Sequence, residues 1–364
     1  MLKNPSQSWR IHDLPVGRLL NIAQADTETF RLVILLGKRK FFWSTLPQLS
    51  TSDEPSLAET KPRKFKPMHL NRKLLFALTL LAAIVGALPT RSAGQILNIS
   101  TRVDCQTGDA VVVTEFIAYG TGTETFILRG LGPSLGAVGI PDPLADPVLN
   151  LLDARGNRVG RNDNWMDNRD AQEIEDSGLA PTNALEPAII EELKPGVYTS
   201  VVQGKAHGEG VALADMYDLE GDLQLSAVGT RGFVGTADHV LISGIIISGS
   251  SPLPLLVRAL GPSLTDAGLH GALADPTLEL FNSNGQVILS NDNWKDTQQS
   301  EVEATGLAPT DDLESAAVVK LSPGAYTAVV AGVGGGTGLG FLQWYSINAP
   351  IRELNPAPPL RPPR

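Results

Sequence analysis

The stretch LADPTLELFNSNGQVILSNDNW, residues 273–294, decides the fold because it is a second version of an earlier stretch. Residues 144–165 read LADPVLNLLDARGNRVGRNDNW, with the same length, the same LADP start and the same NDNW end. The shift between the two stretches, 273 minus 144, is 129 residues. A period this long indicates two copies of a domain-sized unit, not a solenoid of small repeats.

The same register aligns further segments on both sides of this stretch. The matching segments are LRGLGPSL at 128–135 with VRALGPSL at 257–264, GLAPT at 178–182 with GLAPT at 306–310, and PGVYT at 195–199 with PGAYT at 323–327. The last two pairs are shifted by 128 residues, so the second copy is one residue shorter. We therefore predict one repeat over residues 95–220 and a second over 221–348.

Within each repeat the pattern is that of β-strands. Residues 109–117 form a run rich in β-branched side chains, and residues 239–247 form its counterpart. Gly156 and Gly285 each sit in an Asx-containing turn between two alternating segments, which is typical of a hairpin. Seven or eight short strands in each repeat predict an all-β protein of two tandem β-sandwich domains. The Pro-rich residues 349–364 are expected to be a disordered tail.

Charge is unevenly distributed along the 364 residues. Residues 1–95 hold 14 Lys and Arg against 6 Asp and Glu, a net charge of +8, whereas residues 96–364 hold 15 against 33, a net charge of −18. An acidic body repels phosphate backbones, so nucleic acid is not an expected partner. Cys105 is the single cysteine, which excludes an intrachain disulfide and a cysteine-based zinc site.

The front of the chain carries an apolar segment. Residues 74–88, LLFALTLLAAIVGAL, follow basic residues and precede the small residues Ser92 to Gly94, which is the pattern of a secretory signal peptide over residues 68–94. We expect Met68 to be the true start, with residues 1–67 a disordered or mis-assigned extension. The alternative is a cytoplasmic tail on an uncleaved membrane anchor. Either way, membrane contact is expected only through this hydrophobic helix.

Three features of each repeat resemble the bacterial pre-peptidase C-terminal (PPC) domain of secreted and surface proteins. These features are the Asx-rich hairpin that begins at residues 151–156, the LKPGVYT strand at 193–199, and the closing strand, with their partners in the second copy. The resemblance covers residues 97–348. It implies a jelly-roll-like sandwich outside the cytoplasm, non-catalytic in most cases, and in some relatives a calcium or matrix-polymer binder.

Two patterns could carry chemistry. The segment Gly132 to Gly136 fits the G-x-S-x-G nucleophile elbow around Ser134, but the residues after it cannot form the helix that an elbow needs, and Thr265 replaces the last glycine in the second copy. The second pattern is a repeated set of Asx residues at the hairpin exit. These could supply oxygen ligands to calcium, or they could simply satisfy the backbone of a turn: Asn162, Asp163, Asn164, Asp167, Asn291, Asp292, Asn293 and Asp296.

Four further side chains have expected roles. Trp165 and Trp294 could be platforms for sugar rings, but a Trp beside a hairpin more often covers the core. Arg129 and Arg258 lie at strand ends, and each is expected to pair, across the sandwich, with an acid that both repeats retain. Together these observations predict a secreted, periplasmic or cell-surface protein that acts in adhesion, scaffolding or ligand binding. The expected partner is an extracellular polymer or surface protein, and Ca²⁺ is the expected cofactor, if any. We expect no enzymatic activity. The alternative is a secreted esterase or glycosidase, or an accessory domain of one.

Overall fold

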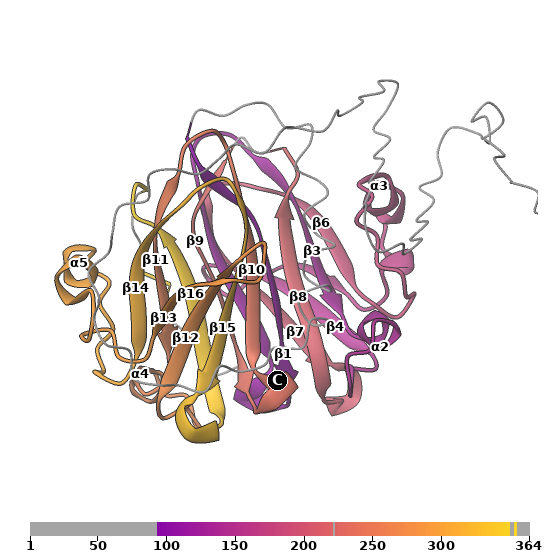
Figure 1. The fold of residues 1–364 in the computed structure, drawn as a ribbon. Coiled ribbons are helices and arrows are strands. Elements are labelled where there is room, and N and C mark those ends of the chain that lie inside the picture. Colours follow the sequence, from indigo (N-terminus) through magenta and orange to yellow (C-terminus); the bar gives the residue numbers. More distant parts are fainter. Residues whose placement is uncertain (1–92, 221–222, 350–352, 355–364) are drawn as a thin grey trace, which may run out of the picture. The chain divides into compact units, whose positions relative to one another are not determined.

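The computed structural model describes residues 93–220, 223–349 and 353–354. The predicted extension at 1–67 and almost all of the predicted signal segment at 68–94 lie outside the described residues. In the described part of the chain sixteen strands dominate, and the predicted all-β class is confirmed (Figure 1).

Each repeat contributes eight strands in the same order. The first repeat holds β1 (Gln95–Cys105), β2 (Val112–Tyr119), β3 (Glu124–Leu131), β4 (Pro147–Asp153), β5 (Arg158–Asn162), β6 (Ala188–Leu193), β7 (Gly196–Gly204) and β8 (Gly210–Asp218). The second holds β9 (Gln224–Val234), β10 (Leu241–Ser248), β11 (Leu253–Leu260), β12 (Pro276–Asn282), β13 (Val287–Asn291), β14 (Ser315–Leu321), β15 (Gly324–Gly332) and β16 (Gly338–Ser346).

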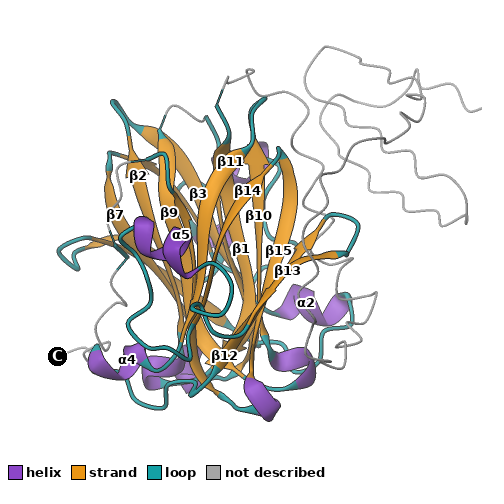
Figure 2. Cartoon of the chain, turned by 60° about the vertical axis from the view of Figure 1, so that its left-hand side comes forward, coloured by secondary structure: helices purple, strands orange, loops and turns teal. Residues whose placement is uncertain are grey.

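The helices are short and lie outside the strands (Figure 2). They are α2 (Pro133–Ala137), α3 (Ala171–Asp176), α4 (Ser263–Asp266) and α5 (Gln299–Ala304). The glycines that end α3 and α5, Gly178 and Gly306, have φ of 74° and 71°, the left-handed conformation that glycine adopts without strain. None of the helices among the described residues has the length and apolar character needed to cross a membrane.

The predicted arrangement as two tandem domains is not confirmed, because strands of the two repeats pair with each other. One eight-stranded sheet runs β6-β3-β8-β1-β10-β15-β12-β13, and the other runs β14-β11-β16-β9-β2-β7-β4-β5. Each sheet therefore takes four strands from each repeat. Two parallel bridges between β1 and β9 also join the sheets at the centre.

The physical reason for this exchange lies at the edges of each repeat. Alone, a repeat would form two four-stranded blocks, one ending at β1 and the other at β2. An unpaired strand edge exposes a row of backbone donors and acceptors. Pairing β1 with β10 and β9 with β2 satisfies both edges in both repeats.

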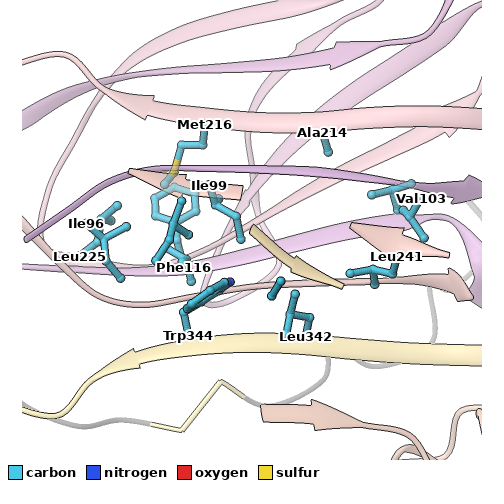
Figure 3. Close-up of a cluster of buried hydrophobic side chains, with 14 of the residues drawn as sticks. Ile96, Ile99, Val103, Phe116, Ala214, Met216, Leu225, Leu241, Leu342 and Trp344 are labelled. Atoms are coloured by element: carbon cyan, nitrogen blue, oxygen red, sulfur yellow. The ribbon is translucent and has the colours of Figure 1, made fainter. Parts of the chain in front are cut away.

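The largest hydrophobic cluster of the described residues takes members from both repeats. Ile99 of β1 and Phe116 of β2 belong to the first repeat, and Leu342 and Trp344 of β16 belong to the second; all four are at most 1% exposed (Figure 3). The core is therefore built jointly and could not be divided at residue 220 without exposing it.

Four buried hydroxyls cross the centre of this core. Thr101 donates to Thr230 Oγ1 at 2.9 Å, Thr101 is 3.0 Å from the Ser243 hydroxyl, and Thr230 is 3.2 Å from that of Thr114. Thr101 and Thr230 are equivalent positions of the two repeats, and so are Thr114 and Ser243. All four are at most 2% exposed, so the chain of hydroxyls fixes the register in which the repeats meet.

Candidate functional site

In the first repeat, three loops meet at the carboxylate of Glu186. The side chain is fully buried, and its Oε1 accepts hydrogen bonds from the backbone of Gly132 at 2.9 Å, from the backbone of Ser134 at 2.8 Å and from the Ser134 hydroxyl at 2.6 Å. Its backbone carbonyl accepts a fourth hydrogen bond, from Trp165 N at 3.0 Å. One residue thus joins the turn after β3 to the hairpin exit after β5.

The second repeat builds the same site around Glu314. Its Oε1 accepts from Gly261 N at 2.8 Å and from Ser263 N and Oγ at 3.0 and 2.6 Å. Trp294 N donates to the Glu314 carbonyl at 2.9 Å. The glutamates were missed by the sequence reasoning, although Leu-Glu recurs at 185–186 and 313–314 with the repeat shift.

This geometry explains the glycine before each serine. A Cβ on Gly132 would lie 2.0 Å from the carbonyl oxygen of Leu144, and a Cβ on Gly261 would lie 2.1 Å from that of Leu273. The backbone can approach the LADP segment this closely only where no side chain stands.

The serine of the G-x-S-x-G pattern is part of this hydrogen-bonded turn. The sequence predicts no helix here, but Ser134 lies in the first turn of α2, a short helix that ends at Ala137. Ser134 Oγ donates to a carboxylate oxygen that already receives two backbone N–H groups. Glu186 thus accepts backbone N–H groups at the start of α2, and the Ser134 hydroxyl donates to the same internal carboxylate.

The eight residues predicted to hold calcium lie in two sets, one at each hairpin exit. Asn162 is 8% exposed; its Oδ1 accepts from Ala188 N at 3.0 Å and its Nδ2 donates to the Asn164 carbonyl at 3.0 Å. Asn291 makes the same two bonds, with Ala316 N and the Asn293 carbonyl. These amides connect the hairpin to the next strand, so their oxygens are already engaged.

In each set a second asparagine contacts an aspartate of the same set. Asn164 Nδ2 donates to Asp167 Oδ2 at 3.2 Å, and Asn293 Nδ2 donates to Asp296 at 3.4 Å. Among the described residues no group of three or more His, Cys, Asp or Glu side chains is arranged to hold a metal ion. Calcium at these positions stays a proposal.

A lysine distinguishes the hairpin exit of the first repeat. Lys205 Nζ lies 3.0 Å from Asp163 and 3.5 Å from Asp146. Val333 occupies the equivalent place in the second repeat, as its backbone shows: Val333 N donates to the Asp275 carbonyl just as Lys205 N donates to that of Asp146. Partial burial raises the pKa of Asp275, and the negative charges of its neighbours Asp292 and Asp311 add to that rise.

The two tryptophans are covers of the core, as expected. Trp165 is 7% exposed and Trp294 is 5% exposed, which leaves little ring surface for a sugar. Trp294 Nε1 also donates to the Asp311 carbonyl at 3.1 Å. Trp165 belongs to a cluster of buried residues of the first repeat, whereas the cluster of Trp294 also includes Ile117 from the first repeat.

Arg129 pairs with an acid, but that acid, Asp215, lies on the neighbouring strand β8 of the same sheet and not across the sandwich as predicted. Its Nε and Nη2 donate to the two oxygens of Asp215 at 2.9 and 2.6 Å, while Nη1 donates to the Leu179 carbonyl. Burial by itself would lower the pKa of Arg129, but the charge and hydrogen bonds of Asp215 outweigh it and raise that pKa. Burial also raises the pKa of Tyr217, whose ring lies under the guanidinium.

Arg258 has a different set of partners. Its Nε and Nη2 both donate to Gln343 Oε1, at 2.9 and 2.6 Å, and its Nη1 donates to the Leu307 carbonyl. Its acidic partner is Glu353, at 3.2 Å, which comes from the C-terminal segment and not from the opposite sheet. The predicted pairing with an acid holds, but the acid's position was not foreseen.

Comparisons with known proteins give no family for this chain. No family model matches it, and no curated protein matches it. Among solved structures, a DUF4785 family protein from Legionella pneumophila subsp. pneumophila str. Philadelphia 1 aligns over 71% of this chain and 68% of its own, with 8% identity and a TM-score of 0.20. A score that low carries no argument about fold or function.

Proposed function

We propose that this is a secreted or cell-surface protein that acts without catalysis, in adhesion, scaffolding or ligand binding. The observation that carries the proposal is the duplicated carboxylate of Glu186 and Glu314, which engages the hydroxyls of Ser134 and Ser263 in the same internal way. A nucleophile needs a hydroxyl that faces a substrate and a base that can take its proton. Here both serines instead stabilise a turn.

The presence of this glutamate–serine hydrogen bond in both repeats supports the same proposal. Catalysis by one cleft needs no second copy of its acid and its serine, whereas a binding or structural loop gains from being presented twice. Beside the two glutamates, Leu185 and Leu313 are each 46% exposed at equivalent positions. We infer that these loops are the surface through which an extracellular polymer or surface protein is contacted.

Export is the second part of the proposal. It rests on the signal-peptide pattern at residues 68–94 and on the resemblance to PPC-type repeats. Fractionation of cells that express the full chain tests it. The expected result is a shortened protein outside the cytoplasm whose N-terminus lies close to Gln95. A full-length cytoplasmic product would contradict export.

The absence of catalysis is tested with ester and glycoside substrates. The unmodified chain and the variants Ser134→Ala and Ser263→Ala should show the same background turnover. Turnover that falls in either variant while the melting temperature stays unchanged would favour the alternative, a secreted hydrolase.

Calcium is tested by melting the chain in EDTA and in millimolar Ca²⁺. A ligand at a hundred times its Kd stabilises a protein by about 2.7 kcal/mol. A shift of that size that is lost in Asp163→Asn or Asp292→Asn would place calcium at the hairpin exits. Coincident melting curves would remove calcium from the proposal.

A further inference from the structure

Glu353 and Leu354 contact the second repeat. Leu354 is 1% exposed and packs in a hydrophobic cluster with Leu256, Phe341 and Tyr345. The sequence predicts that residues 349–364 are a disordered tail, and for Glu353 and Leu354 this is wrong. Leu354 is part of a buried hydrophobic cluster.

Polar contacts hold the backbone of this leucine on both sides. Leu354 N donates to the Tyr345 hydroxyl at 3.0 Å, and Gln343 Nε2 donates to the Leu354 carbonyl at 3.2 Å. Glu353 Oε1 accepts from Arg258 Nη2 at 3.2 Å. The second repeat therefore binds three features of these two residues: the Glu353 carboxylate, the Leu354 backbone and the apolar Leu354 side chain.

A single difference between the repeats explains why only the second one has this site. Position 215 is an aspartate, whose two oxygens neutralise Arg129 within the sheet. The equivalent position 343 is a glutamine, which accepts both donors of Arg258 on one neutral oxygen. The guanidinium side chain of Arg258 is 2% exposed, and a buried charge requires an opposite charge. Glu353 supplies it from outside the sheet.

The contact between Glu353 and Arg258 is exposed enough for Glu353 and Leu354 to leave the site. The Glu353 side chain remains 56% exposed, so its ion pair with Arg258 is screened by water on one side. The residues on either side of Glu353 and Leu354 in the sequence are rich in proline. The Asp215 carboxylate, by contrast, is fully buried and belongs to a central strand.

We propose that Arg258, Gln343 and Tyr345 form a binding site for an acidic residue followed by leucine. In this chain Glu353 and Leu354 occupy the site, and a peptide with the same two residues competes for it. This inference goes beyond the proposed function, because it concerns a different surface from the loops around Glu186 and Glu314.

The first test uses a full-length variant in which Glu353 and Leu354 no longer occupy the site. Glu353→Lys combined with Leu354→Asp removes both the charge and the apolar anchor. A fluorescent peptide of residues 350–359, PIRELNPAPP, is titrated and its polarisation measured. We expect it to bind the released variant at least about tenfold more tightly than the unmodified chain, and peptides with Glu353→Gln or Leu354→Ala to bind more weakly.

A matched control comes from the first repeat. Gln343→Asp, added to the released variant, gives Arg258 the partner that Arg129 already has, so the fold should be kept while peptide binding is lost. Equal peptide binding with and without Gln343→Asp, or equal binding to the released variant and the unmodified chain, would overturn the proposal.

A second measurement uses the otherwise unmodified chain and does not depend on the folding of the released variant. Hydrogen exchange is followed at the Leu354 amide, which donates to Tyr345. It should be protected at least about tenfold in the unmodified chain, and Gln343→Asp or excess peptide should remove that protection. Exchange at the rate of an unprotected amide in the unmodified chain would overturn the proposal.

Discussion

In the first repeat Arg129 is neutralised by Asp215 from a neighbouring strand of the same sheet, whereas in the second repeat Arg258 meets Gln343 and takes its counter-charge from Glu353, far along the chain. The guanidinium, the tyrosine ring beside it and the backbone carbonyl that caps Nη1 are otherwise the same. One substitution in a strand has therefore changed a closed ion pair into a site that an additional segment can fill.

A second difference lies at the hairpin exits. Lys205 holds two aspartates together in the first repeat, and Val333 leaves their equivalents, Asp275 and Asp292, without that lysine in the second. By contrast, both repeats keep the glutamate site with the same three donors. The two copies thus keep the contacts that hold the fold and differ where a charged side chain of the first repeat is replaced by an uncharged one in the second.

The largest expected effect is at the arginines. Asp215→Ala leaves Arg129 buried without a counter-charge and should lower the free energy of unfolding by about 3–5 kcal/mol. Gln343→Ala removes a neutral side chain that accepts from Arg258 and donates to the Leu354 carbonyl, while Glu353 remains, and should lower it by about 1–2 kcal/mol. Urea denaturation measures both values. If the two variants lost equal stability, the proposed difference between the repeats would be mistaken.

The next effect is at the glutamates, where the repeats should agree. Glu186→Ala leaves three donors without their acceptor and should lower the free energy of unfolding by about 3 kcal/mol. Glu314→Ala should match it within about 1 kcal/mol, because its hydrogen bonds of 2.8, 3.0 and 2.6 Å are close in length to the 2.9, 2.8 and 2.6 Å of Glu186. Ser134→Ala removes only one of the three donors and serves as the milder control. A large difference between the two glutamates would show that the sites are not energetically equivalent.

A smaller effect is expected at the centre of the core. Thr230→Val deletes a hydroxyl that bonds to both Thr101 and Thr114, and it should lower the free energy of unfolding by about 1–2 kcal/mol. Ser243 lies at the end of the chain of hydroxyls, so Ser243→Ala should cost less. The reverse order in chemical denaturation would argue against the shared hydroxyl chain.

The smallest effect is at the hairpin exits. Val333→Lys gives Asp275 the cation that Asp146 has and should raise the free energy of unfolding at pH 7 by about 0.5 kcal/mol, since the pair is partly exposed. Lys205→Val should have the opposite sign. If Val333→Lys did not raise the free energy of unfolding at low ionic strength, the new ammonium group would not pair with Asp275.

The same position gives a pH dependence. The pKa of Asp275 is raised in the folded protein above its ordinary value of 3.8, so the folded state binds this proton more tightly than the unfolded state does. Its contribution to stability is full below the unfolded pKa and is lost as the pH rises through the folded pKa. Denaturation from pH 3.8 upward should show this loss in the unmodified chain and less of it in Asp275→Asn.

Much of the local structure could be predicted from the sequence. The hairpin predicted around Gly156 is β4–β5, and its glycine has φ of 76°, as the turn requires. The same holds around Gly285, with φ of 73°. Alternating apolar residues indicate strands, and glycine and Asx residues indicate turns, because both signals depend only on neighbours in the chain.

The candidate sites were predictable only in part. The sequence pointed to the serine turn and the Asx residues, but not to Glu186, which lies 52 residues from the Ser134 hydroxyl it accepts. Arg129 was expected to have an acid, yet nothing local singles out Asp215, 86 residues away. Buried polar contacts of this kind are chosen by the packing of whole strands.

By itself the sequence determined the strands, the turns and the duplication, since each is a property of residues close together in the chain. Only the tertiary structure decided which strands became neighbours. β1 and β9 carry the same kind of pattern and could have closed two separate sandwiches. They pair across the repeats because each half-sheet would otherwise end in an unpaired edge, and because the apolar faces of both repeats are buried together in one core.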